Sequence, residues 1–187
     1  MAYKRVNRKL QEKKVEKLKT ILDFVLMFNL LSLPMYISIH FNLESFYFRV
    51  LESTIVCKFF NMLRYDTICN GNLFIIKHDS KIYSINVSWD STGWKSLYAF
   101  FSLIIATPLS MKRKKLILPL GVLVIFFVNL FRIFTTVLLS LKFGVEKFGI
   151  LHTSLWSEGM IIIVIFLWMY WLLKEKNNIG EIKYIIR

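Results

Sequence analysis

The sequence predicts a mainly α-helical, polytopic membrane protein of about four transmembrane helices, with an outer amphipathic helix and a small β-hairpin. Hydrophobic residues make up 56% of the 187 residues, and they occur in apolar blocks of about 20 residues, the length at which a helix crosses the core of a bilayer. The chain also carries 25 Lys and Arg against 12 Asp and Glu, so charged and apolar residues are segregated along it. This combination is typical of a polytopic membrane protein and excludes an ordinary soluble domain.

The basic residues gather in three clusters beside the apolar blocks. Sixteen of the 25 Lys and Arg fall in residues 1–19, 112–115 and 174–187. An excess of Lys and Arg marks cytoplasmic segments, and these three alternate as cytoplasmic segments should. We therefore expect a multi-pass protein of the cell membrane with both termini in the cytoplasm. The same distribution favours contact with anionic membrane lipids and argues against a nucleic-acid partner.

Residues 1–187 are expected to form a single membrane domain that begins with the basic cytoplasmic segment 1–19 and a first span over 20–39. This apolar run contains one charged residue, Asp23, and Pro34 is predicted to kink it. We interpret it as a retained span, because it is too long for a signal peptide and lacks a small-residue cleavage site.

Residues 44–90 are predicted to lie outside the membrane. In residues 44–62, charged residues are spaced among aromatic and aliphatic ones as in an amphipathic helix. We expect this helix to lie in the outer interface of the membrane. Beyond it, two short runs of β-favouring residues, 73–76 and 82–87, are each preceded by a turn signal. These runs predict a small β-hairpin.

Three further spans are expected over residues 94–109, 116–139 and 154–173, followed by a cytoplasmic tail over 174–187. The first of these is short for a bilayer unless Lys95 extends towards the outer headgroups. The basic cluster before the next span and the basic tail after the last place the other ends of these helices outside.

Polar residues converge at the outer ends of the last three spans. Arg132 lies sixteen residues beyond Leu116, or about 24 Å along the helix, and an arginine within a span normally faces a protein interior or a water-filled cavity. Asn129 is three residues earlier and shares its face. By topology, Ser91 before the second span and His152 before the fourth lie at the same level.

Each of these residues also has an ordinary structural explanation. Arg132 would reach the outer headgroups, Ser91 or Asp90 would cap the helix of the second span, and His152 would be a surface or capping residue. Together, however, they suit acyl transfer, which needs a nucleophile near a helix N-terminus, an imidazole that moves protons and a guanidinium that holds an oxyanion.

No metal ion or other cofactor is expected. The acidic residues form neither the carboxylate pair of an aspartic protease nor the ligand cluster of a metalloprotease. The two cysteines, Cys57 and Cys69, have no metal-binding spacing, and the sequence leaves open whether they form a disulfide or stay unpaired.

With its polar blocks in this order, the sequence resembles the exosortase/archaeosortase family of membrane-embedded, sortase-like transpeptidases. The resemblance covers about residues 65–175 and rests on three blocks, which are Ser91-Thr92-Gly93-Trp94-Lys95-Ser96, Asn129-Leu130-Phe131-Arg132, and His152 followed by Gly159.

The resemblance implies roles for these residues. Position 91 would attack the carbonyl of a sorting signal, Arg132 would orient the substrate or stabilise the oxyanion, and His152 would act as acid and base. Four further residues would bind the substrate or support the site, namely Thr92, Gly93, Ser96 and Asn129. The implied partners are secreted proteins with a carboxy-terminal tripartite sorting signal, and a lipid-linked acceptor.

The family pattern has a cysteine where this chain has Ser91. A serine hydroxyl must lose its proton during attack, whereas a cysteine can be ionised beforehand, so serine is the poorer unaided nucleophile. We interpret Ser91 as a Cys-to-Ser replacement that gives an inactive or trapped form, with a natural serine variant as the alternative.

Two other functions are weighed against the transpeptidase. A non-catalytic membrane protein that binds sorting-signal or other membrane segments is favoured by Ser91. A transporter or channel is disfavoured, because the polar residues lie near one face of the membrane and form no path through the spans.

Overall fold

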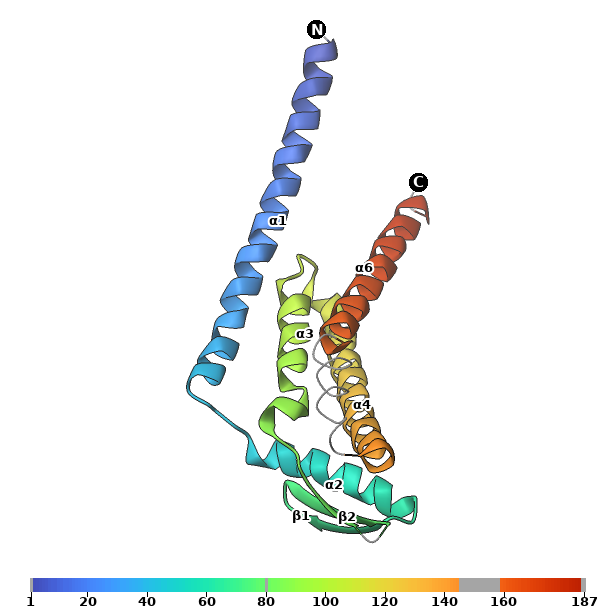
Figure 1. Ribbon diagram of the computed structural model, residues 1–187. Coiled ribbons are helices and arrows are strands. Elements are labelled where there is room, and N and C mark those ends of the chain that lie inside the picture. Colours follow the sequence, from blue (N-terminus) through green and yellow to red (C-terminus); the bar gives the residue numbers. More distant parts are fainter. Residues whose placement is uncertain (1, 80, 145–158, 186–187) are drawn as a thin grey trace.

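A computed structural model describes the fold of residues 2–79, 81–144 and 159–185 (Figure 1). The chain is mainly helical, as predicted, with a small antiparallel sheet between its second and third long helices. The helices are α1 (Ala2–His40), α2 (Phe46–Met62), α3 (Trp94–Ala106), α4 (Met111–Phe143) and α6 (Gly159–Ile185). In Figure 1, α1, α3, α4 and α6 run lengthwise, and α2 and the sheet lie across one end of them.

Two of the described helices are long and apolar enough to cross a membrane, over Leu10–His40 and Met111–Phe143. Only 6% of the apolar window in the first is buried inside the protein, so its hydrophobic side chains require lipid to cover them. The apolar helix α3 has 13 residues, which is about 20 Å of helix and less than the roughly 30 Å of a bilayer core.

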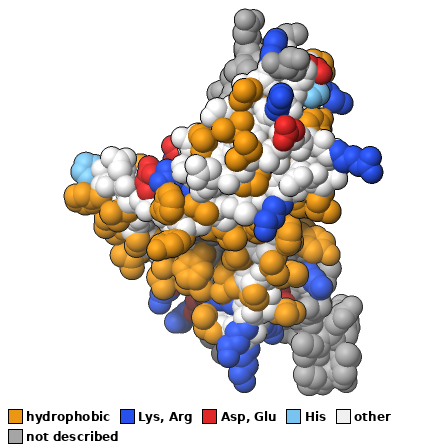
Figure 2. Space-filling view, turned by 90° about the horizontal axis from the view of Figure 1, so that it is seen from below, with side chains coloured by type: hydrophobic (Ala, Val, Ile, Leu, Met, Phe, Trp, Pro, Cys, Tyr) orange, Lys and Arg blue, Asp and Glu red, His pale blue; other side chains and the backbone are white. Residues whose placement is uncertain are grey.

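The end of the molecule that carries α2 and the sheet has a broad hydrophobic surface (Figure 2). Helix α2 begins after Ser45, whose hydroxyl accepts a hydrogen bond from the backbone N–H of Phe48. Large apolar side chains of α2 are exposed, namely Phe46, Tyr47, Leu51, Phe59 and Met62. An exposed apolar face beside charged residues is the property expected of a helix in a membrane interface.

The sheet has three antiparallel strands in the order β1-β2-β3, which are β1 (Asp66–Asn70), β2 (Leu73–His78) and β3 (Lys81–Asn86). The predicted hairpin corresponds to β2 and β3, so the prediction was incomplete. Strand β1 was missed because its sequence, DTICN, begins and ends with residues that are rare in strands.

A disulfide joins Cys57 of α2 to Cys69 of β1. This bond settles the pairing that the sequence left open, and it ties the helix to the first strand. Cys57 is also fully buried, so the disulfide is part of the packed region between α2 and the sheet.

Two hydrophobic clusters meet at α4. The first cluster joins α2, β2 and the second half of α4, and includes Phe60, Phe74 and Ile133. The second joins α3, α4 and α6, and includes Phe100, Ile125 and Val164. Helix α4 is therefore the element that α2 and the sheet share with α3 and α6.

Helices α3 and α4 approach each other closely at Gly121, because a Cβ atom there would overlap the ring of Phe100. Phe100 is fully buried and cannot move aside. We expect Gly121→Ala to destabilise the protein by about 1–3 kcal/mol, as overpacking of a core does. Thermal unfolding in detergent would measure this as a lower Tm.

The control for this prediction is the pair Gly121→Ala and Phe100→Leu. If the alanine acts through the ring, the double variant is less destabilised than the sum of the two single variants. Additive losses would contradict the proposed contact between Gly121 and Phe100.

Candidate functional site

Position 91 lies on a single 3-10 turn, η1 (Trp89–Thr92), between the sheet and α3. The hydroxyl oxygen of Ser91 is 2.8 Å from that of Ser88. The N-cap of α3 is Gly93, which makes no side-chain capping bond, and Asp90 instead pairs with Lys95 at 2.7 Å. Neither Ser91 nor Asp90 therefore caps α3, and the capping explanation for Ser91 was wrong.

Ser91 and Arg132 line the same small cavity, of about 50 Å³. The cavity lies between the turn, the end of β3 and the second half of α4, and its lining residues are Ile85, Asn86, Val87, Ser91, Arg132, Ile133, Thr136 and Val137. Arg132 is only 8% exposed, so its side chain packs within the protein and does not extend to the headgroups. The space suits one or two small polar groups, such as a carbonyl, because a water molecule occupies about 30 Å³ in the liquid.

Asn129 connects this turn to two helices. Its Nδ2 group donates hydrogen bonds to the backbone carbonyl of Ser91 and to Oε1 of Glu52, each at 3.0 Å. Asn129 is fully buried. It also lies against Gly93, where an added Cβ atom would approach the Asn129 Cγ to 2.8 Å.

Gly93 is required at this point for two reasons. Its φ of +67° is in the left-handed region, which side-chain-bearing residues rarely adopt. The space beside it is already filled by Asn129. Gly93, the third residue of Ser91-Thr92-Gly93, therefore lets the turn pass directly against the Asn129 side chain.

Glu52 of α2 completes this arrangement, and the sequence reading missed its role. The structure buries Glu52 completely, and burial raises the pKa of its carboxyl to about 8, against smaller opposing effects of the hydrogen bond from Asn129 and the charge of Arg132. Glu52 precedes the buried Val56 and Phe60 by four and eight residues. This helical spacing was the signal that could have placed it on the inner face of α2.

The remaining predicted residues have simpler surroundings. Thr92 is fully buried and its hydroxyl donates to the Trp89 carbonyl at 2.7 Å, which stabilises the turn. Ser96 is half-buried in the first turn of α3, where its backbone N–H bonds to Gly93. His152 lies outside the described residues, as does the beginning of the predicted fourth span at 154–158.

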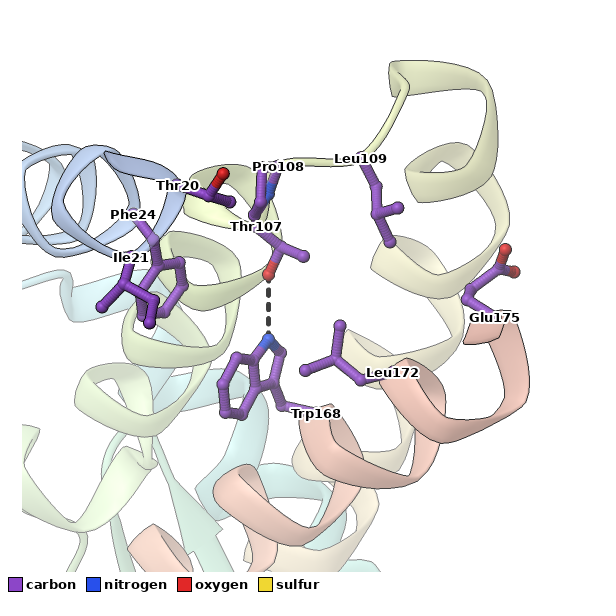
Figure 3. Close-up of a pocket in the computed structure, with 9 residues that line it drawn as sticks. All are labelled: Thr20, Ile21, Phe24, Thr107, Pro108, Leu109, Trp168, Leu172 and Glu175. Atoms are coloured by element: carbon purple, nitrogen blue, oxygen red, sulfur yellow. Dashed lines mark hydrogen bonds between the residues drawn. The ribbon is translucent and has the colours of Figure 1, made fainter. Parts of the chain in front are cut away.

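A larger cavity, of about 470 Å³, lies at the other end of α3 (Figure 3). It is lined by Thr20, Ile21, Phe24, Thr107, Pro108, Leu109, Trp168, Leu172 and Glu175. The Trp168 indole donates a hydrogen bond to the Thr107 hydroxyl at 2.9 Å. Since Thr107 follows α3 and Ser91 precedes it, this cavity is separate from the one beside Ser91 and Arg132.

Within the part of the chain that the structure describes, no three His, Cys, Asp or Glu side chains are grouped closely enough to hold a metal ion. The described side chains around position 91 offer a hydroxyl, a guanidinium, an amide and a buried carboxyl.

Comparison with known proteins identifies one family. The family model described as Transmembrane exosortase (Exosortase_EpsH) matches residues 16–172, which include positions 91, 129, 132 and 152. No curated protein and no solved structure matches the chain significantly.

The pH dependence of stability tests the burial of Glu52. The folded protein holds this proton more tightly than the unfolded chain, where the pKa is near 4.5. Unfolding between pH 4.5 and about 8 then releases a proton, and stability falls as the pH rises through this window. We expect Glu52→Gln, which cannot ionise, to flatten the fall in Tm measured in detergent across that range.

Glu44→Gln is the matched control for Glu52, because it removes a carboxylate just before α2, where the side chain is 44% exposed and paired with Arg49. This variant should keep the slope of the unmodified protein. An unchanged slope in Glu52→Gln would contradict the burial of a protonated carboxyl.

Proposed function

Because the chain belongs to the transmembrane exosortase family, we propose that it forms a sortase-like transpeptidase site for the carboxy-terminal sorting signals of secreted proteins. The observation that carries the proposal is the shared cavity of Ser91 and Arg132, which brings two of the three family blocks together. A nucleophile position and a guanidinium at one small cavity are what attack on a carbonyl and stabilisation of the oxyanion require.

We propose a four-span arrangement in which α1, α3, α4 and α6 cross the membrane and the site faces outside. The basic cluster at 112–115 starts α4, and Ser91 and Arg132 lie towards the opposite end. The Cys57–Cys69 disulfide supports an outer position for α2 and the sheet, since such bonds persist outside the reducing cytoplasm.

Thiol labelling tests this orientation. The chain has two cysteines. If free thiols are blocked with maleimide at the moment of lysis, we expect the denatured protein to carry no label, and to accept two labels only after reduction.

Cys69→Ala is the control for the labelling, because it leaves Cys57 without its partner. This variant should label once without reductant. Two labels on the unmodified, unreduced protein would contradict both the disulfide and the outer location of α2.

The proposed reaction uses position 91 as the attacking group. The hydroxyl or thiol of position 91 gives its proton to His152 while its oxygen or sulfur bonds to the carbonyl carbon of a peptide bond in the sorting signal, and Arg132 donates hydrogen bonds to the oxyanion. The C–N bond then breaks, the leaving amine takes that proton from His152, and the acyl group stays on position 91. A nucleophilic group of the lipid-linked acceptor gives its proton to His152 and attacks the acyl carbon, and the released side chain of position 91 takes this proton back.

Serine at position 91 limits the first step. The described side-chain partner of Ser91 is the hydroxyl of Ser88, at 2.8 Å, and a neutral hydroxyl does not act as a base at ordinary pH. We therefore propose that this chain binds a sorting signal in a trapped, inactive form of the site. A natural serine variant activated by His152 is the alternative within the same family.

Restoring the thiol tests the function. In the Ser91→Cys protein we expect cleavage of a fused reporter that ends in a tripartite signal, measured by the shortening of the reporter in membranes. Adding Arg132→Ala should reduce the cleavage rate by about 100-fold or more, as the loss of an oxyanion donor does. His152→Ala should abolish cleavage.

Arg113→Ala is the control for the arginine, because Arg113 lies at the other end of α4 and pairs with Glu175. It should leave cleavage intact. Full cleavage after removal of Arg132 or His152 would refute the assignment of these two residues.

A non-catalytic function is the second candidate, and Ser91 is the observation that favours it. In that case the Ser91→Cys protein crosslinks to a sorting-signal tail but never yields a thioester. Mass spectrometry of the acid-quenched protein distinguishes the two, because an acylated thiol at position 91 carries the mass of the substrate fragment.

A further inference from the structure

We propose that the free edge of β3 binds the substrate as an added β-strand, and that the bound segment is the one on the amino-terminal side of the cleaved peptide bond. This inference rests on the proposed function. It is carried by the geometry of β3, by the groove beside it and by the continuity of that groove with the cavity at Ser91 and Arg132.

Strand β3 is an edge of the sheet, because it pairs with β2 and no other described strand pairs with it. The backbone N–H of Val87 donates to the Asn72 carbonyl. Asn72 and Val87 are therefore a hydrogen-bonded pair of opposite residues at the end of the ladder between β2 and β3. Hydrogen-bonded and non-bonded pairs alternate along an antiparallel ladder. The backbone groups of Ile82, Ser84 and Asn86 therefore point away from β2, towards the free edge.

A groove of about 350 Å³ runs along this edge. One wall is β3 from Ile82 to Asn86, and the other is the outer end of α4, with Val137, Ser140 and Leu141. The edge thus faces a protein wall at a distance that leaves room for another chain. Strand residues 82–86 span roughly 13 Å, enough for an extended segment of four or five residues.

The groove leads to the candidate catalytic cavity. Three residues, Ile85, Asn86 and Val137, line both spaces. The cavity at Ser91 and Arg132, of about 50 Å³, is much smaller than the groove, of about 350 Å³. A peptide that presents a carbonyl there must occupy adjoining space, and the groove supplies it.

The position of the groove decides which side of the cleaved bond it holds. Val137 and Leu141 lie five and nine residues beyond Arg132 on α4, or roughly 8 and 13 Å farther along the helix. In the proposed orientation this direction is outward. Because the sorting signal is carboxy-terminal, the secreted part of the substrate precedes it and lies outside, so the outer groove receives the residues that precede the cleaved bond.

The chemistry of the groove fits a peptide main chain. Outward backbone N–H and C=O groups of an edge strand bind any extended chain, and alternate side chains then enter the flanking pockets. Asn86 is held in place, since its Oδ1 accepts a hydrogen bond from Asn72 at 2.9 Å. The apolar wall of Val137 and Leu141 favours small or apolar substrate side chains.

Ser84→Pro tests the strand addition directly. Proline removes the backbone N–H of residue 84, which points to the free edge, and an edge strand tolerates this because the ladder to β2 is untouched. In the Ser91→Cys protein, we expect at least a tenfold loss in kcat/KM for the fused reporter, mainly through KM. Ser84→Ala keeps the N–H and changes only the side chain, so its loss in kcat/KM should be well below that of Ser84→Pro, and both variants should keep the Tm of the parent.

Photocrosslinking gives a second readout that needs no catalysis and no proline. Benzoylphenylalanine placed at Leu141 in the Ser91 protein should crosslink the reporter at residues preceding the cleavage point. The same group at Leu116, which is 79% exposed near the inner end of α4, should crosslink lipid. Crosslinks at Leu141 to lipid only, or to residues after the cleavage point, would overturn the proposal.

These measurements separate the groove from the reaction. Cleavage by the Ser91→Cys protein that Ser84→Pro leaves unchanged, without reporter crosslinks at Leu141, overturns strand addition and leaves the transpeptidase standing. Reporter crosslinks at Leu141 without any cleavage by the Ser91→Cys protein support the groove and refute the transpeptidase.

Discussion

The amide of Asn129 makes the contacts on which the end of the molecule that carries α2 and the sheet depends. It bonds the carbonyl of Ser91 and the carboxyl of Glu52, and so joins the turn before α3 and the helix α2 to the wall of α4. Asn129 and Glu52 are fully buried, so losing a partner there leaves a polar group unsatisfied at a cost of about 1–3 kcal/mol. Asn129 and Arg132 lie about one turn apart on the same helix, α4. The hydrogen bond from Asn129 to Ser91 therefore fixes position 91 relative to Arg132.

Packing and a disulfide hold α2 and the sheet in place around the contacts of Asn129. Cys57 and Phe60, on the buried face of α2, pack with β2 and the outer half of α4, and the Cys57–Cys69 disulfide connects the same face to β1. Helix α2 is fixed by these contacts, and it therefore places Glu52 beside Asn129. The groove beside β3 has one wall in this assembly and the other in α4, so its width depends on the same packing.

Particular residues show how far the sequence could predict the site. Asn129 and Arg132 were predicted to share a helix face, because their spacing of three residues determines this whatever the surroundings. Glu52 was not predicted, because its spacing from Val56 and Phe60 places it on the inner face of α2 only once those two residues are known to be buried. The pairing of Cys57 was left open for a related reason, because the approach of β1 to α2 is a long-range contact that no local pattern encodes. Ser91 was weighed as a helix cap, and only the left-handed Gly93 shows that the helix starts after it.

The shortness of α3 has a consequence for the lipid around the site. At 13 residues it is about 20 Å long, so in the proposed four-span arrangement the bilayer next to it must thin, or polar headgroups must dip, to meet its ends. This local depression would bring water and headgroups down to the level of Ser91 and Arg132. In the proposed reaction, the sorting signal of the substrate and the lipid-linked acceptor then meet position 91 at one depth in the membrane.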